Sequence, residues 1–218
     1  MNVLAFDTAT EVLAIAAVRE GAWASLCVRR GLQHSPSLLP LVDKLFAELG
    51  LAAADLELLV CSLGPGSFTG IRIGLATALG IAQGRGIPVV GVSTLDAMAK
   101  PWEAHDGDVF PVIDARKGKI YTARFHGGAR LSEYLDVSPA DLAALCAAAD
   151  RPLLAGPDSG RIRDSLGEVG RGLPCAEVLD PCSLLLIGVE KHAKEGAVPL
   201  ALRPLYLRKS EAEIASGL

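Results

Sequence analysis

The residues best placed to do chemistry lie in one stretch, Leu58 to Ala82, which reads LLVCSLGPGSFTGIRIGLATALGIA. An apolar run of strand length, Leu58 to Ser62, leads into a Gly-Pro-Gly turn at residues 64–66, and Ser67 or Thr69 can then cap a helix. Strands that enter a helix through a glycine-rich turn often present backbone N–H groups to phosphate. The stretch therefore predicts either an anion site or a device for close packing.

Sharper motifs are absent from this stretch. No lysine follows the turn, which excludes a P-loop, and Gly70 comes one residue too late for G-x-G-x-x-G. The spacing G-x-S-x-G is also missing, so Ser67 is not a nucleophile elbow. Gly70, Gly74 and Ala78 stand four apart, which leaves one nearly bare helix face. Since glycine inside a helix costs about 1 kcal/mol relative to alanine, we expect another element to approach this face closely.

Composition excludes several classes of protein. The 218 residues are 50% apolar, which is ample for a core, and they carry a net charge of −4 with a pI near 5.6. Strong nucleic-acid binding by the chain alone is not expected, because it needs a basic face. The five cysteines include no C-x-x-C pair, which predicts reduced thiols. With no signal peptide and no apolar run of about 18 residues, we expect a cytoplasmic chain without membrane contact.

The first half predicts the order β-β-β-α-β-α-β-α. Glycine, proline and capping residues separate apolar runs of strand or helix length throughout this half. Pro40 fits only within the first turn of its helix, and Gly50 closes that helix. The predicted elements are strands Val3–Phe6, Val12–Val18 and Trp23–Val28, a helix from Pro36 or Ser37 to Leu49, strand Leu58–Ser62, a helix ended by Gly84 and Gly86, strand Pro88–Val92, and a short helix Leu95–Ala99 capped by Ser93 or Thr94.

The second half starts after a polar link, Pro101 to Asp108, which we interpret as a domain boundary. The predicted domains are 1–104 and 105–218, and a terminal segment of about 204–218 is expected to pack back on the first. The predicted elements are strands Val109–Asp114, Ile120–Phe125 and Leu131–Val137, a helix Pro139–Ala148 capped by Ser138, strand Leu153–Ala155, a helix from Asp158 or Ser159, a helix Ser183–Lys194, an extended stretch Pro204–Leu207 and a terminal helix Glu211–Ala215.

The two halves repeat one pattern. LAFDTAT in the first half corresponds to PVIDARK in the second, and LLVCSLGPGSFTG corresponds to PLLAGPDSGRI. Both pairs read strand-Asp-hairpin and then strand-Gly-Pro-helix. A duplicated β-β-β-α-β-α unit predicts an α/β chain of the actin-like, sugar-kinase and heat-shock ATPase fold. This fold-level analogy says little about chemistry by itself.

A family resemblance rests on blocks that span the whole chain in order. GPGSFTGIRIGLATALG closely resembles the signature of the TsaB family, the non-catalytic partner subunits of the bacterial tRNA threonylcarbamoyladenosine machinery. Further matching blocks are LAFDTAT, HSPSLLPLVDKL, GVSTLD, VIDARKGKIY and RPLYLRKSEAE. The long signature is highly specific, whereas DTAT or DAR alone is weak.

The resemblance implies that the chain has no catalytic residue and no metal site. The paralogous catalytic subunit, TsaD, carries two metal-ligand histidines four apart, and Thr94 and Met98 stand at those places in this sequence. A hydroxyl and a thioether do not replace two imidazoles as ligands of iron or zinc. The four histidines of the chain lie at no metal-binding spacing and are interpreted as surface or structural residues. They are His34, His105, His126 and His192.

Two hairpin turns of the implied nucleotide cleft are altered. Asp7 and Thr8 keep a small turn that can approach phosphate, with Asp7 interpreted as the cap of that turn. The second turn, at Asp114, carries Arg116 and Lys117 in place of small residues. We expect these two side chains to fill the cleft, while anion binding by them stays an alternative. No cofactor is expected, and ATP or ADP is expected only in the complex.

With no catalytic or metal-binding residue expected, we predict that the chain functions through a docking surface on its first two long helices. In the resembled family these helices pack against TsaD as a four-helix bundle, and the isolated protein uses the same surface to form a homodimer. The small ATPase TsaE joins the system, and tRNA is reached through the complex. For each residue the alternative is ordinary core. The predicted interface comprises Leu38, Leu41, Val42, Leu45, Phe46, Gly70, Ile73, Gly74, Thr77, Ala78 and Ile81.

Two other functions stay open. A small-molecule kinase of the same fold needs a working second phosphate turn, which DARKG does not resemble. A metallopeptidase needs a metal pair or a nucleophile–base pair, and the sequence contains neither in a recognisable spacing. A modest basic group, Arg203, Arg208 and Lys209, is either a solvated tail or a contact for RNA.

Overall fold

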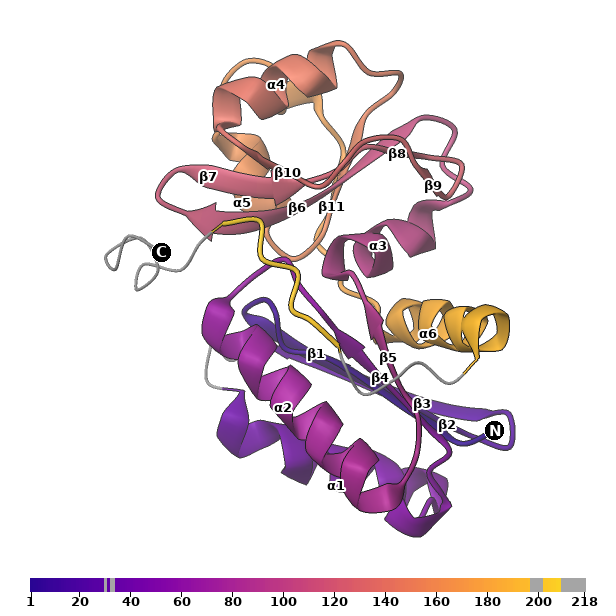
Figure 1. The fold of residues 1–218 in the computed structure, drawn as a ribbon. Coiled ribbons are helices and arrows are strands. Elements are labelled where there is room, and N and C mark those ends of the chain that lie inside the picture. Colours follow the sequence, from indigo (N-terminus) through magenta and orange to yellow (C-terminus); the bar gives the residue numbers. More distant parts are fainter. Residues whose placement is uncertain (30, 32–33, 197–201, 209–218) are drawn as a thin grey trace.

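The computed structural model describes residues 1–29, 31, 34–196 and 202–208. Two halves lie one above the other, each built on its own sheet (Figure 1). The strands of the first sheet lie in the order β3-β2-β1-β4-β5, with β1 parallel to β4 and antiparallel to β2. Their bounds are β1 Val3–Asp7, β2 Val12–Arg19, β3 Ala22–Arg29, β4 Leu58–Ser62 and β5 Val89–Val92.

The second sheet repeats this topology. Its strands lie in the order β10-β7-β6-β11-β12, with β6 parallel to β11 and antiparallel to β7, and a short β8–β9 hairpin extends beside β6. The predicted duplication and the actin-like fold are therefore confirmed. The bounds are β6 Asp108–Arg116, β7 Lys119–Thr122, β8 Phe125–His126, β9 Ala129–Arg130, β10 Leu135–Val137, β11 Leu153–Ala155 and β12 Cys175–Ala176.

Alternation along the strands divides the first half into two cores. Leu4 and Phe6 of β1 face helices α1 (Ser35–Leu49) and α2 (Phe68–Arg85), whereas Val3 and Ala5 face α6 (Pro181–Glu195). Because successive side chains on a strand point to opposite faces, both faces of this sheet need a cover. The second half is covered by α4 (Pro139–Ala147) and α5 (Ser159–Asp164).

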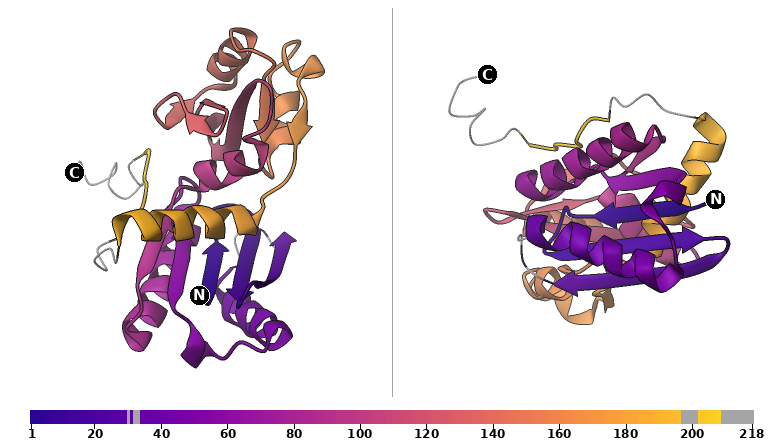
Figure 2. Two further views of the ribbon diagram at one scale, coloured as in Figure 1. Left: turned by 90° about the vertical axis from the view of Figure 1, so that its right-hand side faces the viewer. Right: turned by 90° about the horizontal axis from the view of Figure 1, so that it is seen from below.

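The helix α6 crosses between the halves. The sequence placed it with the second half, yet it packs along the first sheet, opposite α1 and α2 (Figure 2). A Cβ added at Gly188 lies 2.4 Å from Val60 of β4, so glycine is what lets the α6 backbone approach the sheet. The equivalent helix of the first half, α3 (Thr94–Ala99), contacts β6 in return. The halves are thus joined by exchanged helices as well as by the chain.

The helix α1 differs from its prediction at two points. It begins at Ser35, so Pro40 lies inside the helix beyond its first turn and cannot donate a hydrogen bond to the carbonyl of Pro36. Phe46, which the sequence analysis assigned to the docking surface, is buried because it packs in the same core as Leu38. The predicted end is confirmed, since Gly50 adopts a left-handed conformation with φ 60°.

The helix α2 follows its prediction closely. The side chain of Ser67 accepts a hydrogen bond from the backbone N–H of Gly70 at 3.2 Å, which makes Ser67 the cap and leaves Thr69 inside the first turn. Gly86 ends the helix with φ 67°, whereas Gly84 lies within it. Ser93 caps α3 and Ser138 caps α4, the latter in a reciprocal capping box with Asp141.

The segment 202–208 packs back on the molecule. The backbone N–H of Leu205 donates to the carbonyl of Leu63 at 2.7 Å, and Tyr206 stacks on Phe68 of α2 with ring centroids 4.4 Å apart. Arg208 then contacts the second half, where its guanidinium donates hydrogen bonds to the carboxylate of Asp136. The predicted terminal helix Glu211–Ala215 lies outside the described residues. Across the described residues, none of the helices is long and apolar enough to cross a membrane.

Candidate functional site

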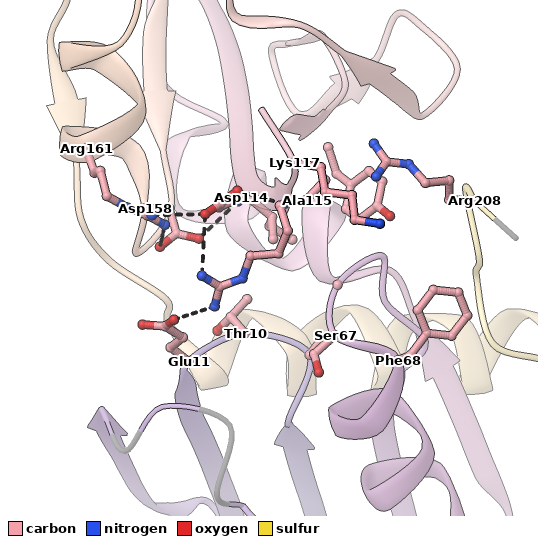
Figure 3. Close-up of a pocket in the computed structure, with 15 residues that line it drawn as sticks. Thr10, Glu11, Ser67, Phe68, Asp114, Ala115, Lys117, Asp158, Arg161 and Arg208 are labelled. Atoms are coloured by element: carbon pink, nitrogen blue, oxygen red, sulfur yellow. Dashed lines mark hydrogen bonds and ion pairs between the residues drawn. The ribbon is translucent and has the colours of Figure 1, made fainter. Parts of the chain in front are cut away.

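A cleft of about 490 Å³ opens between the two halves, where the predicted phosphate turns face each other (Figure 3). The first half contributes the β1–β2 turn and the start of α2, and the second half contributes the β6–β7 turn and the start of α5. Residues that line the cleft are Ala9, Thr10, Glu11, Gly66, Ser67, Phe68, Ile113, Asp114, Ala115, Arg116, Lys117, Tyr121, Asp158, Arg161 and Arg208.

The first turn is held together by its own hydrogen bonds. Asp7 accepts from the backbone N–H of Ala9 at 2.7 Å, as expected of a turn cap, and is 1% exposed. Thr8 donates to the carbonyl of Gly70 at 2.7 Å. Burial raises the pKa of Asp7, against the opposing effects of the Ala9 N–H and the nearby hydroxyls of Thr94 and Ser62. Asp7 and Thr8 therefore lie beneath the cleft, not on its wall.

Asp7 gives a prediction for the dependence of stability on pH. Because the folded pKa lies above the unfolded value, ionised Asp7 opposes folding at neutral pH, and this cost disappears as the pH falls through the folded pKa towards 3.8. The unfolding free energy of the wild type should therefore rise relative to that of Asp7→Asn on acidification, by at most about 1.4 kcal/mol per pH unit. Urea unfolding of both proteins between pH 7 and 4 measures the difference; a constant difference contradicts the assignment.

The second turn crosses the cleft without filling it. Arg116 and Lys117 adopt left-handed conformations with φ 62° and 52°. The guanidinium of Arg116 lies 2.7 Å from Glu11 of the first half, and Asp114 accepts from the backbone N–H of Arg116 at 2.8 Å. Since about 490 Å³ stays open, the expectation that Arg116 and Lys117 fill the cleft is wrong. Arg116 runs along one side to its partner Glu11, which the sequence analysis did not identify.

The positions that carry metal ligands in the resembled transferase are buried here. Thr94 and Met98 are 0% and 1% exposed, and Met98 packs against Gly156. Among the residues that the structure describes, no three His, Cys, Asp or Glu side chains converge in a way that could hold a metal ion. His34 is a structural residue, since its Nε2 lies 2.6 Å from the carbonyl oxygen of Thr10 and the ring is buried.

The predicted docking residues divide into two groups. Seven are buried within the chain and therefore present little or no surface: Leu38, Val42, Leu45, Phe46, Gly70, Gly74 and Ala78. The bare face of α2 is occupied by the chain's own β1–β2 turn, because Cβ atoms added at Gly70 and Gly74 meet Thr8 at 2.0 and 2.3 Å. The other four are half-buried: Leu41, Ile73, Thr77 and Ile81. Leu39, 51% exposed on α1, is an outward apolar residue that the predicted docking set omitted.

The structure describes two of the three residues of the basic group near the C-terminus, and one of them, Arg208, is paired. Arg208 binds the carboxylate of Asp136 through two nitrogens, at 2.7 and 2.9 Å. Arg203 is exposed, and Lys209 lies outside the described residues.

The fold and the site together show the class of protein to which the chain belongs, which is a duplicated actin-like chain with an open cleft between its halves. The family model of TsaD, tRNA N6-adenosine threonylcarbamoyltransferase, matches residues 30–153. The chain is 35% identical over 224 residues to the tRNA threonylcarbamoyladenosine biosynthesis protein TsaB of Bacillus subtilis, which covers 98% of this chain and 96% of the relative. It belongs to the TsaB family.

Solved structures agree with this assignment. YeaZ from Pseudomonas aeruginosa superposes with a TM-score of 0.80 at 26% identity, covering 94% of this chain and 99% of that one. AlfA, from the Bacillus subtilis plasmid pLS32 and solved as a filament, matches with a TM-score of 0.50 at 12% identity over 85% of this chain and 98% of that chain, which shows a shared fold alone.

Proposed function

We propose that this chain is a non-catalytic scaffold subunit in tRNA threonylcarbamoyladenosine biosynthesis. It binds a TsaD-type transferase and supports threonylcarbamoylation of the tRNA adenosine next to the anticodon. The observation that carries the proposal is its membership of the TsaB family over nearly its whole length. The tRNA is reached through the complex, a TsaE-type ATPase joins it, and the chain works in the cytoplasm without a resident cofactor.

Two observations on the described residues support the scaffold role. A transferase of the resembled type needs two imidazoles on its metal, and Thr94 and Met98 supply neither an imidazole nor access, since both are buried. The buried thiols do not offer a nucleophile either, because burial raises the pKa of Cys61 to about 12 and that of Cys146 to about 11. Activity then resides in the partner subunit.

The outward faces of α1 and α2 are the proposed docking surface. Ile73, Thr77 and Ile81 recur four residues apart along α2, and α1 adds Leu39 and Leu41 on the same side of the first sheet. Around them α2 is small or uncharged at Ala76, Gly80, Gln83 and Gly84. Small residues let a partner helix approach closely, and partly exposed aliphatic residues provide apolar area for burial. In the absence of the transferase, the same surface pairs two copies of the chain.

Ile73→Glu tests this surface. The substitution places a carboxylate in the middle of the proposed interface, and we expect affinity for the TsaD-type subunit to fall about 100-fold, since central interface residues contribute 2 kcal/mol or more. Isothermal titration of purified subunits measures the loss, and light scattering should show the homodimer becoming monomeric.

A matched control is Leu186→Glu on α6, where an exposed leucine (41%) lies on a helix at the opposite face of the first sheet. It makes the same kind of change and should bind the partner like the wild type. Circular dichroism confirms that both variants fold. If folded Ile73→Glu binds the partner as tightly as the wild type, the outward faces of α1 and α2 are not the docking surface. If Leu186→Glu loses as much affinity as Ile73→Glu, the effect is not specific to these faces.

A further inference from the structure

One guanidinium lies among the small and apolar residues on the outward face of α2. The helix carries two charged residues, which are Arg72 near its start and Arg85 at its last position. Arg72 is exposed, and because residues four apart share a helix face, it begins an exposed row that continues with Ala76 and Gly80. This row runs alongside Ile73 and its neighbours on the proposed docking surface. A partner that covers the docking surface therefore also covers Arg72.

Two aromatic rings hold the Arg72 guanidinium in place. Tyr206 stacks on Phe68 with an angle of 27° between the ring planes. The guanidinium carbon Cζ of Arg72 lies 5.8 Å from the ring centroid of Phe68 and 5.9 Å from that of Tyr206, and its Nε donates to the Tyr206 hydroxyl at 3.0 Å. Both rings and the hydrogen bond restrict the rotamers of Arg72, so this side chain loses less entropy when a partner binds it.

Tyr206 is fixed in turn by the strap, the segment 202–208, which runs past the start of α2 to the second half (Figure 1). At one end the strap is held by the hydrogen bond from Leu205 to Leu63. At the other end Arg208 and Asp136 form a pair whose side chains are only 28% and 20% exposed. Bidentate pairs of this kind fix geometry well. Through the strap, the second half contributes to the proposed docking surface.

The two terminal nitrogens of Arg72 can bind a group on a partner. Within the described part of the chain they form no hydrogen bond and no ion pair, and neither α2 nor the strap contains Asp or Glu. A carboxylate matches the fork of a guanidinium, and the pair is strengthened when an interface excludes water. Recognition of RNA needs several cations on one face, whereas the neighbours of Arg72 along α2 are apolar or small.

We propose that Arg72 receives a carboxylate of the TsaD-type subunit and that Tyr206 is the positioning residue that orients it. The inference rests on the proposed function, because it names one contact within the same interface. Arg72→Gln should bind the purified TsaD-type subunit about 30-fold more weakly than the wild type, as measured by isothermal titration. Arg72→Lys keeps the charge but not the fork, and its affinity should fall about tenfold. Raising the salt concentration from about 50 to 500 mM should weaken the wild type more than Arg72→Gln.

Tyr206→Phe tests the positioning role, because it keeps the ring stack and removes the hydroxyl. We expect affinity to fall about threefold in the wild-type background and to stay unchanged in the Arg72→Gln background. A merely structural role of the hydroxyl gives the same loss in both backgrounds and overturns the positioning role. Arg171→Gln is the matched control, since it removes one positive charge from a side chain of the second half that is 82% exposed, and it should bind like the wild type.

Circular dichroism confirms that each variant folds. Wild-type affinity in folded Arg72→Gln overturns the proposal, as does an equal loss in Arg171→Gln. If Arg72→Gln weakens tRNA binding by the complex but not binding of the transferase, the guanidinium contacts RNA and the proposal is wrong. If Ile73→Glu loses affinity and Arg72→Gln does not, the docking surface stands and this inference alone fails. If the wild type does not bind the TsaD-type subunit, the proposed function fails and this inference fails with it.

Discussion

Leu45→Glu should leave the chain unfolded or close to it. Leu45 is 4% exposed and packs in the core between α1 and the first sheet, so the new carboxylate would be buried without a partner. We expect a loss of about 4 kcal/mol or more, a large part of the 5–15 kcal/mol by which domains are stable. Urea unfolding followed by circular dichroism measures it.

Leu39→Glu is the control on the same helix. Leu39 is 51% exposed, and its substitution should change stability by no more than about 0.5 kcal/mol. Because Leu39 is part of the proposed docking surface, this folded variant should also lose affinity for the transferase. A stable Leu45→Glu protein contradicts the orientation of α1 in the structure. The comparison tests the sequence-based prediction that Leu45 contacts a partner.

Gly70→Ala should be the most damaging single methyl group on α2. The added Cβ lies 2.0 Å from the backbone carbonyl oxygen of Thr8, and a backbone atom cannot move aside cheaply. We expect a loss of about 2–3 kcal/mol, although alanine is the better helix former. Thermal or urea unfolding tests this value. Gly74→Arg is expected to fail for a related reason, since its Cβ meets Thr8 Oγ1 at 2.3 Å.

Gly80→Ala separates packing from helix propensity. Gly80 lies in the same helix, but nothing stands within 4 Å of its added Cβ, so the substitution should stabilise the chain by up to about 1 kcal/mol. Opposite signs for the two substitutions support a turn that rests on α2 at Gly70. If Gly70→Ala and Gly80→Ala both destabilise the chain, or if neither does, this packing of the turn on α2 is contradicted.

The pattern of elements could be predicted because it depends on local chemistry. Alternation and apolar runs identified the longer strands of both halves but not the two-residue strands β9 and β12, and the predicted strand Leu131–Val137 is confined to Leu135–Val137. Glycine at positions 50 and 86 marked helix ends through its left-handed backbone. Errors arose where packing overrides a local rule. Pro40 sits inside α1 because core contacts of Leu38, Val42 and Phe46 hold the helix despite a missing hydrogen bond.

The candidate sites were predicted less completely than the fold. The β1–β2 and β6–β7 turns, which the fold analogy set on opposite sides of one cleft, both contribute to its lining, but Asp7 and Thr8 lie beneath it. Glu11 was missed because nothing in the sequence links it to Arg116, a residue 105 positions away. The predicted docking set mixed inward and outward residues, because an apolar face of a helix looks the same in sequence whether it meets a sheet or a partner.

By itself, the sequence determined the duplicated strand-hairpin-strand-helix pattern, the family, and the absence of histidines at the transferase's metal-ligand positions, since all three are written in residue order. Only the tertiary structure decided that α6 covers the first sheet, that the bare face of α2 receives the chain's own turn, and that Glu11 meets Arg116 across an open cleft. These contacts join residues far apart in the chain, and shape and charge select them only after both halves have folded.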